Sequence, residues 1–447
     1  MQTYDRFIFE SFDLDPKART INLQYSLDDK IRFTETFTLP ADLPLNPDQP
    51  DLEAALFALH LSGGASYYKT YCPKIIEVKS GQLNKAQADF WNKLYTDGLG
   101  QFFYENNLDF HGLINFPVTS KKASPKPKKD YKHHFKHALV PFGGGKDSIV
   151  TSEILRAASV PQTLFRLRGH KIITELAGIA NLPVIEVGRT LAPEIFDLNK
   201  AGAYNGHVPI TAHISFFTIV MSLLAGFDSV FFSNERSSSY GNVEYLGMSV
   251  NHQWSKSLEA ETMLRTYIED YITPDVAYSN ALRPLSELHI AKLFSTHPQY
   301  FGAATSCNRN WILTERPEGA PRWCGTCPKC AFSFSLFAAF LPSETVTGIF
   351  GQNLFENTEL LPLYRELWGV EGFKPFECVG TPEEAQAACF LAAKKPGFTG
   401  TAIMQEFEKR VRPDLKNPKD LVEQLLAPEL QDSPPSITDI LKKARIL

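Results

Sequence analysis

An excess of positive charge is absent from this sequence of 447 residues. It contains 45 Lys and Arg against 50 Asp and Glu, so its formal net charge at pH 7 is −5. A basic surface is usual in a protein that binds nucleic acid, and no nucleic-acid partner is expected here. The first fifteen residues include acidic side chains and form no continuous apolar run, which argues against a signal peptide. The protein is therefore expected to be cytoplasmic.

Long apolar runs are also scarce. The one stretch of membrane length covers residues 208–226, which include His213 and several Ser and Thr and have no basic flank. A buried helix explains this stretch better than a membrane span, and no membrane partner is expected. The hydrophobic fraction of 43% and the charged fraction of 21% are ordinary for a globular protein. At ~100–200 residues per domain, the length predicts two or three domains.

A glycine-rich turn is the first positive signal. Residues 137–158 read HALVPFGGGKDSIVTSEILRAA, which is typical of a short apolar strand, a turn and an amphipathic helix. Glycines let the backbone come close to a ligand, and the amides and dipole of the helix N-terminus favour an anion. The turn therefore predicts a phosphate site. The alternative is a plain linking turn in which Asp147 and Ser148 act as an ordinary helix cap.

From residue 137 strands and helices alternate, which predicts a doubly wound parallel sheet of the α/β class with helices on both faces. Ligands of such sheets bind at the carboxyl ends of the strands. Arg166 and Arg168 lie after the second predicted strand, and Glu235 and Arg236 after the fourth, in SNERSSSYGN. Glu235 could hold Mg²⁺ or act as a base, and Arg236 could bind a phosphate or carboxylate. The alternative for SNERSSSYGN is a polar surface loop.

The chain is predicted to divide into four parts. Residues 1–45 alternate apolar and polar side chains as antiparallel strands do, and residues 51–107 have helical periodicity. The lysine-rich segment that follows is typical of an exposed linker. The predicted parts are an N-terminal α+β domain (1–118), a basic linker (119–136), the α/β domain (137–345) and a helical C-terminal region (346–447).

Four of the seven cysteines form a cluster in TSCNRNW and RWCGTCPKC. Two overlapping C-x₂-C pairs and a more distant cysteine can close a tetrahedral zinc site without an open position. A structural Zn²⁺ is therefore expected, with an iron–sulfur cluster as the alternative. Cysteine usage of this kind indicates a reducing compartment. The predicted ligands are Cys307, Cys324, Cys327 and Cys330.

Two further residues could transfer protons. His207 precedes the long apolar helix, and Cys378 lies in the polar segment 374–384. A histidine can act as an acid or base near neutral pH, and a thiol can accept and return a Cα proton, as paired cysteines do in the cofactor-free glutamate racemases. The structural alternatives are an ordinary loop histidine and a small buried cysteine. Cys72 and Cys389 are interpreted as core residues.

The turn GGGKDS does not fit the P-loop pattern GxxxxGK[ST] or the dinucleotide pattern GxGxxG. It resembles the SGGxDS loop of the ATP-pyrophosphatase (PP-loop) family, with Gly143 in place of the usual serine. The resemblance implies a HUP-type fold and cleavage of ATP to AMP and pyrophosphate with Mg²⁺. It also implies that Lys146 neutralises the pyrophosphate and Asp147 positions Mg²⁺. The implied ATP-binding residues are Gly143, Gly144, Gly145, Lys146, Asp147, Ser148 and Arg166.

Within that family, residues 137–340 are similar to the zinc-containing 7-cyano-7-deazaguanine synthases. The shared features are PLSELHIAKLF (284–294) and TSC…WCGTCPKC, but VPITA (208–212) stands in place of their VPxRN. A related nitrile- or amide-forming ligase is thus one alternative. An amidating or sulfur-inserting enzyme would need a glutaminase domain or a rhodanese-like segment, and neither is evident. A zinc-clamped protein that binds ATP without cleaving it is a further alternative.

The whole chain is similar to the MurL family of ATP-dependent UDP-N-acetylmuramoyl-L-alanyl-L-glutamate epimerases. The features that carry this resemblance are the N-terminal domain, the C-terminal region, and the two motifs SNERSSSYGN and KPFECVGTPEE (374–384). This resemblance implies an acyl-adenylate of a UDP-muramoyl dipeptide, whose terminal L-Glu becomes D-Glu in peptidoglycan precursor synthesis. An adenylated carboxyl group makes the neighbouring C–H acidic, and two acid/base groups then exchange the proton. The catalytic candidates are His207, Glu235 and Cys378, and the candidates for substrate binding are Arg236, Arg309 and Arg322. The sequence does not indicate an oligomeric state.

Overall fold

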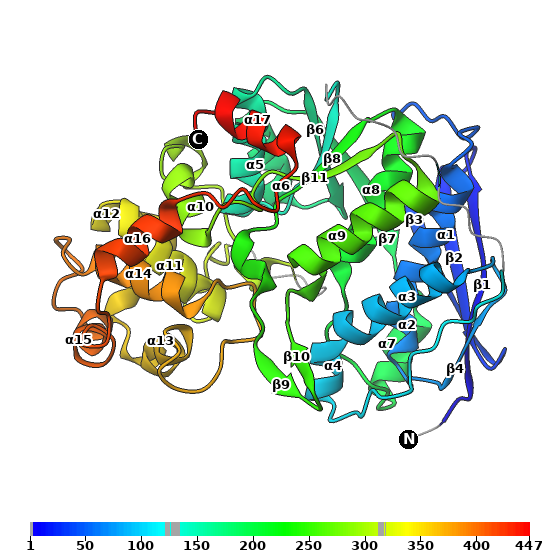
Figure 1. Cartoon of the computed structure of the whole chain (residues 1–447), viewed down its shortest axis with the longest axis horizontal. Helices are drawn as coiled ribbons and strands as arrows, with labels where there is room; N and C mark the ends of the chain where they lie inside the picture. The colour runs from blue at the N-terminus through cyan, green and yellow to red at the C-terminus, as the bar shows by residue number, and fades with distance from the viewer. Residues whose placement is uncertain (1–2, 121–125, 127–134, 312–316, 318) are drawn as a thin grey trace.

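A mixed β-sheet forms the centre of the molecule in the computed structural model, which describes residues 3–120, 126, 135–311, 317 and 319–447 (Figure 1). Within these residues the main sheet has nine strands in the order β11-β8-β5-β6-β7-β3-β2-β1-β4, and β9 and β10 form a separate hairpin. The strands are β1 Arg6–Asp15, β2 Thr20–Leu27, β3 Ile31–Thr38, β4 Ile75–Val78, β5 Ala138–Pro141, β6 Gln162–Leu167, β7 Val184–Thr190, β8 Ser229–Phe232, β9 Val243–Tyr245, β10 Met248–Val250 and β11 Ala277–Asn280.

Helices surround this sheet. Those of the first half of the chain are α1 Leu52–Gly63, α2 Ala65–Tyr68, α3 Lys85–Gly98, α4 Gly100–Glu105, α5 Lys146–Ala157, α6 Lys171–Ala180, α7 Glu194–Lys200 and α8 Ile210–Ala225. Those of the second half are α9 Leu258–Tyr267, α10 Glu287–Phe294, α11 Pro328–Phe340, α12 Ser343–Phe350, α13 Leu361–Leu367, α14 Pro382–Ala392, α15 Ala402–Arg410, α16 Pro418–Leu426 and α17 Pro435–Lys443.

Strands β11, β8, β5, β6 and β7 are parallel to one another. Successive side chains of a strand point to opposite faces, and the two faces enter different hydrophobic cores: Val140 and Leu164 pack with α5, α6, α10 and α11, whereas Leu139 and Phe165 pack with α1, α8 and α9. The predicted α/β class and doubly wound parallel sheet are confirmed. The strand order reverses between β5 and β8, and open α/β sheets bind ligands at such a point.

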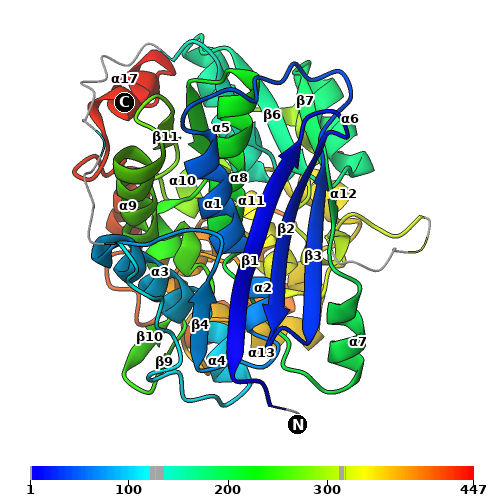
Figure 2. The same ribbon diagram turned by 90° about the vertical axis from the view of Figure 1, so that its right-hand side faces the viewer.

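The N-terminal strands continue the same sheet instead of forming a separate one. β3 pairs antiparallel with β7, where Phe37 lies opposite Arg189. Figure 2 shows β1, β2 and β3 side by side, with α1 behind them. The antiparallel strands expected from residues 1–45 are thus present, but their edge is joined to the α/β sheet. The domain boundaries at residues 118, 136 and 345 stay a prediction, and most of the predicted linker lies outside the described residues.

The long apolar segment forms α8, which begins at Ile210, just after Pro209, and ends at Gly226 in the left-handed conformation that glycine favours. Most of its side chains are buried, as expected for a core helix. Among the described residues no helix is both long and apolar enough to cross a membrane.

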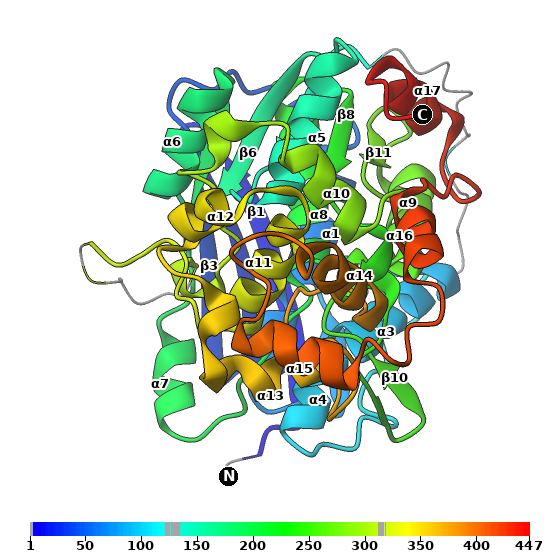
Figure 3. The same ribbon diagram turned by 90° about the vertical axis from the view of Figure 1, so that its left-hand side faces the viewer.

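The C-terminal region is helical, as predicted, and α11 to α16 lie together on one side of the molecule (Figure 3). Helix α14 shows why the sequence folds locally in this way. Thr381 accepts a hydrogen bond from the N–H of Glu384, the Glu384 carboxylate accepts one from the N–H of Thr381, and Pro382 occupies the first turn. The cap fixes the end of the 374–384 loop, which carries Cys378.

Candidate active site

A cavity of about 750 Å³ lies at the carboxyl ends of the parallel strands. The glycine turn after β5, the ends of β6, β7 and β8, the start of α8 and the loop before α14 all contribute to its wall. The wall includes Gly143, Gly145, Asp147, Ser148, Arg166, Arg168, Arg189, Ser233, Asn234, Lys256, Ser306, Lys329 and Cys378. The cavity therefore joins the predicted phosphate turn to the predicted acid/base cysteine.

The backbone of the glycine turn leaves room for a ligand to approach it closely. Gly144 has φ of +76°, a conformation that favours glycine, and a Cβ on Gly145 would lie 2.6 Å from Ser306 Oγ. The hydroxyl of Ser148 donates a hydrogen bond to the Gly145 carbonyl at 3.1 Å. Helix α5 begins at Lys146, so its N-terminal amides and its dipole lie beside the cavity. An anionic ligand is favoured there.

Lys146 is the first residue of α5 and is buried, and its predicted role toward the pyrophosphate stays a prediction. Its side chain is 2% exposed and forms ion pairs with Asp147 at 2.5 Å and with Glu287. These two carboxylates raise the pKa of Lys146 although burial lowers it. The pKa of Asp147, which burial raises, is lowered overall by Lys146, Lys329 and Lys256. Asp147 thus faces the cavity as an ionised carboxylate, and Lys146 lies behind it and not on the cavity wall.

Cys378 lies on the cavity wall among basic side chains. The ammonium group of Lys256 donates a hydrogen bond to Cys378 Sγ at 3.3 Å, and Nε2 of His252 lies 3.7 Å from the same sulfur. Lys329, which is also buried, donates to the Cys378 carbonyl. Three basic residues far from Cys378 in the sequence thus hold its thiol and backbone in place.

The other two acid/base candidates do not line the cavity. The rings of His207 and His252 have centroids 4.7 Å apart and planes tilted by 49°. Burial, followed by the neighbouring basic groups His252, Lys69 and Lys256, lowers the pKa of His207 to about 3. Glu235 is 3% exposed, and its backbone carbonyl accepts a hydrogen bond from Arg283 at 2.7 Å. Its neighbours Ser233 and Asn234 reach the cavity. The roles of His207 and Glu235 stay predictions.

The arginines of the cavity are not the ones predicted to bind substrate. Arg166, Arg168 and Arg189 line the wall. Arg166 lies 4.7 Å from the centroid of the Trp311 ring, and burial, with the charge of Arg168, lowers the pKa of Arg166 to about 10. Arg189 pairs with the buried Glu35 of β3 at 2.5 Å.

The three predicted arginines lie outside the cavity wall. Arg236 pairs with Glu429 at 2.6 Å, Arg322 pairs with Glu175 at 2.5 Å, and Arg309 is exposed. Their assignment to substrate stays a prediction.

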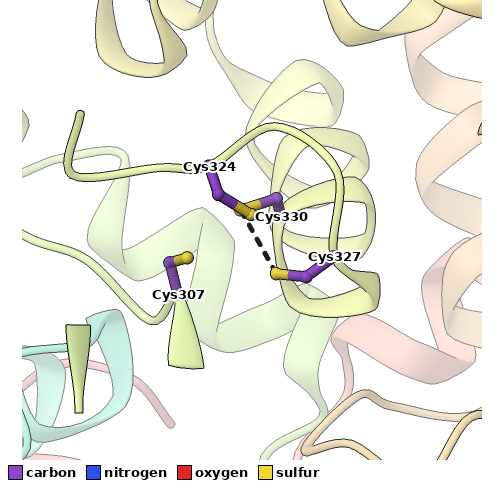
Figure 4. Close-up of side chains that lie close together, drawn as sticks. All are labelled: Cys307, Cys324, Cys327 and Cys330. Carbon is purple, nitrogen blue, oxygen red and sulfur yellow. Dashed lines mark hydrogen bonds between the residues drawn. The ribbon is translucent and has the colours of Figure 1, made fainter. Parts of the chain in front are cut away.

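The four clustered cysteines come together as predicted (Figure 4). Their sulfur atoms all lie within 4.8 Å of one another, and the Sγ atoms of Cys330 lie 3.7 Å from that of Cys324 and 3.5 Å from that of Cys327. Four sulfurs bound to one zinc at about 2.3 Å in a tetrahedron are about 3.8 Å apart. The site therefore fits a four-thiolate Zn²⁺, which would join the segment before α11 to its first turn.

Comparison with known sequences decides the family. The sequence model of the MurL N-terminal domain matches residues 1–280, and that of the MurL C-terminal domain matches residues 303–421. The chain belongs to the MurL family. The expected resemblance is thus confirmed, and the phosphate turn lies in the segment matched by the N-terminal model, whereas the cysteines and Cys378 lie in the C-terminal one.

Three MurL relatives named UDP-N-acetyl-alpha-D-muramoyl-L-alanyl-L-glutamate epimerase match over nearly the whole chain. A protein of Xanthomonas oryzae pv. oryzae is 40% identical over 95% of this chain and 93% of its own length. A protein of a Micromonospora species is 38% identical over 91% and 90%. A protein of Salinispora tropica is 37% identical over 90% and 88%.

Sequence reasoning missed Lys256, His252, Lys329 and Arg189. No local pattern marks them: Lys256 is 122 residues before Cys378, and the residues between include helices α9 to α13 and the cysteine cluster. Lys329 lies inside the predicted zinc motif, in which only the cysteines are defining residues. Tertiary structure alone brings Lys256, Lys329 and Arg189 to the cavity and His252 to Cys378.

Proposed function

We propose that this protein is an ATP-dependent epimerase that converts the terminal L-glutamate of UDP-N-acetylmuramoyl-L-alanyl-L-glutamate to D-glutamate, a step of peptidoglycan precursor synthesis. The names of its relatives support the reaction. The observation that carries the proposal is one cavity lined by both the phosphate turn and Cys378. An enzyme that activates a carboxyl group and then moves the neighbouring proton needs both parts within reach of one substrate.

The first step is adenylation of the glutamate carboxylate. A carbanion beside a carboxylate is strongly disfavoured, because it would place two negative charges on adjacent atoms. Transfer of AMP to the carboxylate removes its charge and turns the carbonyl into an electron acceptor. Gly143, Gly144, Gly145 and Ser148 are suited to hold the departing pyrophosphate through backbone amides and a hydroxyl.

Asp147 is the proposed Mg²⁺ ligand. Its carboxylate faces the cavity and its lowered pKa keeps it ionised at neutral pH, and Mg²⁺ prefers carboxylate and phosphate oxygens. The ion pair with the buried ammonium group of Lys146 holds the Asp147 carboxylate in place. Lys329 and Arg166 line the cavity and are suited to face the phosphates as further cations.

The second step is proton transfer at Cα. Cys378 is the one acid/base candidate of the three that lines the cavity. As a thiolate it takes the α-proton, and the C–H electron pair moves onto the adenylated carbonyl. A second acid/base group then delivers a proton from water to the other face of Cα. Hydrolysis of the acyl-adenylate by water releases AMP and leaves the free carboxylate of the D-isomer.

The arginines of the cavity wall are suited to the anionic parts of the substrate. Arg166, Arg168 and Arg189 provide three guanidinium groups, which bind phosphate or carboxylate through paired hydrogen bonds. A volume of about 750 Å³ is within the usual range of about 300–1,000 Å³ for small-molecule sites. We therefore infer ATP, Mg²⁺ and a structural Zn²⁺ as cofactors, and the cytoplasm, which supplies ATP and UDP-linked precursors, as the compartment.

The test is incubation of the purified protein with ATP, Mg²⁺ and the UDP-muramoyl dipeptide in D₂O. We expect AMP and pyrophosphate in equal amounts, D-glutamate after hydrolysis of the product, and deuterium at Cα by mass spectrometry. Formation of ADP, or epimerisation without ATP, would contradict the proposal. The Cys378→Ala enzyme should still release AMP but incorporate deuterium slowly, and a normal rate of incorporation would remove Cys378 from the mechanism.

A further inference from the structure

We propose that Lys256, Cys378 and His252 form one proton-transfer unit, in which Lys256 stabilises the thiolate of Cys378 and His252 accepts the hydrogen of its thiol form. The inference rests on the proposed epimerase function, because it gives Cys378 the two stable protonation states that a reversible acid/base group needs. Lys256 and His252 act through Cys378 and are positioning residues.

Lys256 supplies the donor for the thiolate. Its Nζ lies 3.3 Å from Cys378 Sγ, and its carbonyl accepts hydrogen bonds from Arg283 and from the Ser238 hydroxyl, the latter at 2.8 Å. These bonds fix the backbone from which the ammonium group extends. Burial disfavours the charge of Lys256, but Cys378, Glu235 and Asp147 raise its pKa above the ordinary value. Lys256 is therefore an ammonium ion at neutral pH and a hydrogen-bond donor to sulfur.

His252 supplies the acceptor for the thiol, and a chain of hydrogen bonds sets its tautomer. The amide nitrogen of Gln101 donates to Glu105 at 2.8 Å, which turns the amide oxygen of Gln101 toward His252 Nδ1 at 2.6 Å. Because that oxygen can only accept, Nδ1 carries the ring proton. Nε2 is then an unprotonated acceptor, and it is the atom that lies 3.7 Å from Cys378 Sγ.

This chain of hydrogen bonds gives the N-terminal part of the molecule a place in the reaction. Gln101 and Glu105 belong to α4, which contacts β10, and His252 follows β10 directly. Figure 1 shows α4 beside the β9–β10 hairpin. Burial and then the charge of Lys256 lower the pKa of His252 to about 3, so His252 stays neutral and does not take the proton itself.

Around Cys378, lysines outnumber acidic groups. The charged or titratable groups that face it are Lys256, Lys329, Lys374, His252 and Glu377. Burial and the nearby thiol raise the pKa of Glu377 to about 7, so Glu377 adds at most a partial negative charge against three lysines. A cation next to a cysteine increases its thiolate fraction.

The two partners have opposite effects on the titration of Cys378, and this separates the proposal from a merely structural role. Loss of the Lys256 donor removes stabilisation from the thiolate, so the pKa of Cys378 should rise. Loss of the His252 acceptor removes stabilisation from the thiol, so the pKa of Cys378 should fall. General loosening of the site would shift both variants in the same direction.

The experiment is alkylation of Cys378 by iodoacetamide in the full-length protein from pH 5 to pH 10, without ATP or muramoyl substrate. The rate is followed on the Cys378 peptide by mass spectrometry, so that the other cysteines do not interfere. We expect Lys256→Met to raise the pH midpoint of alkylation by one unit or more. Lys256→Arg should have a midpoint close to that of the unchanged protein, and His252→Phe should have a lower one. The matched controls are Lys200→Met and His111→Phe, which change exposed side chains and should not move the midpoint.

An unchanged midpoint in Lys256→Met, shifts of the same sign in Lys256→Met and His252→Phe, or no alkylation of Cys378 at any pH would overturn the proposal. Deuterium incorporation with ATP and the muramoyl dipeptide is measured separately on the unchanged protein. If that reaction fails while the opposite shifts are found, the proposed function is wrong and the proton-transfer unit stands.

Discussion

The backbone N–H of Thr305 donates a hydrogen bond to the carbonyl of Gly144 at 3.0 Å. This bond joins the segment that leads into Cys307 to the centre of the phosphate turn. The Thr305 hydroxyl also donates to the carbonyl of Arg322 at 2.8 Å, two residues before Cys324. The cysteine cluster and the phosphate turn are thus parts of one structural unit. A loss of structure at the cysteine cluster should therefore also disturb the backbone of the phosphate turn.

Loss of a cysteine ligand should therefore weaken ATP binding. In Cys324→Ser we expect the metal content, measured by mass spectrometry of the metal, to fall and the melting temperature to drop, because a four-thiolate site stabilises the fold it closes. A backbone hydrogen bond contributes about 1 kcal/mol net, so loosening the Thr305–Gly144 contact should reduce ATP affinity about fivefold by calorimetry.

Cys72→Ser is the matched control for Cys324→Ser. Cys72 is a free, buried cysteine outside the cluster, and its variant should keep one metal per chain and full ATP affinity. Unchanged nucleotide affinity in metal-free Cys324→Ser protein would show that the two sites are independent.

Asp147→Asn should stop the first half-reaction. The substitution keeps the size of the side chain but removes the charge that would bind Mg²⁺, and removal of one electrostatic group from an active site costs on the order of 10²-fold or more in rate. AMP release measured by chromatography should fall accordingly. Asp197→Asn, an exposed residue of α7, is the control, and an Asp147→Asn enzyme that releases AMP at the normal rate would exclude Asp147 as the metal ligand.

The sequence was sufficient for features that depend on local pattern. The glycine turn after β5, the helix that begins at Lys146 and the four cysteines could be found because each is set by spacing along the chain. The side chains that shape the site around Cys378 could not, since Lys256 and His252 reach it only through the packing of distant segments. The position of Lys146 was also beyond prediction, because it depends on Glu287, 141 residues away.

Replacing Lys146 alone should lower the free energy of unfolding more than replacing Lys146 and Glu287 together. Both side chains are almost fully buried, at 2% and 1% exposure, and an unpaired charge left in such a place costs about 3–5 kcal/mol. We expect Lys146→Met to lower the free energy of unfolding by this amount in urea titration. The double variant Lys146→Met with Glu287→Gln should recover part of the loss, and additive effects of the two substitutions would show that the pair is not coupled.

The half-buried histidines His207 and His252 should make the protein sensitive to acid. Burial first, and then neighbouring charges, lower the pKa values of His207 and His252 to about 3, against about 6.5 in an unfolded chain. The unfolded state therefore binds more protons below pH 6.5, so the stability from each neutral histidine is complete above that pH and is lost as the pH falls toward 3. The slope is about 1.4 kcal/mol per pH unit for each group.

His252→Phe isolates one of these contributions, because the carboxylates that titrate in the same range are common to both proteins and cancel in the comparison. Between pH 6.5 and pH 5 the unchanged protein should lose about 2 kcal/mol more of its unfolding free energy than His252→Phe does. The measurement is urea unfolding at both pH values, with the exposed His111→Phe as the control. Equal losses in all three proteins would mean that His252 already carries its proton in the folded state, and a protonated ring could not accept the thiol hydrogen of Cys378.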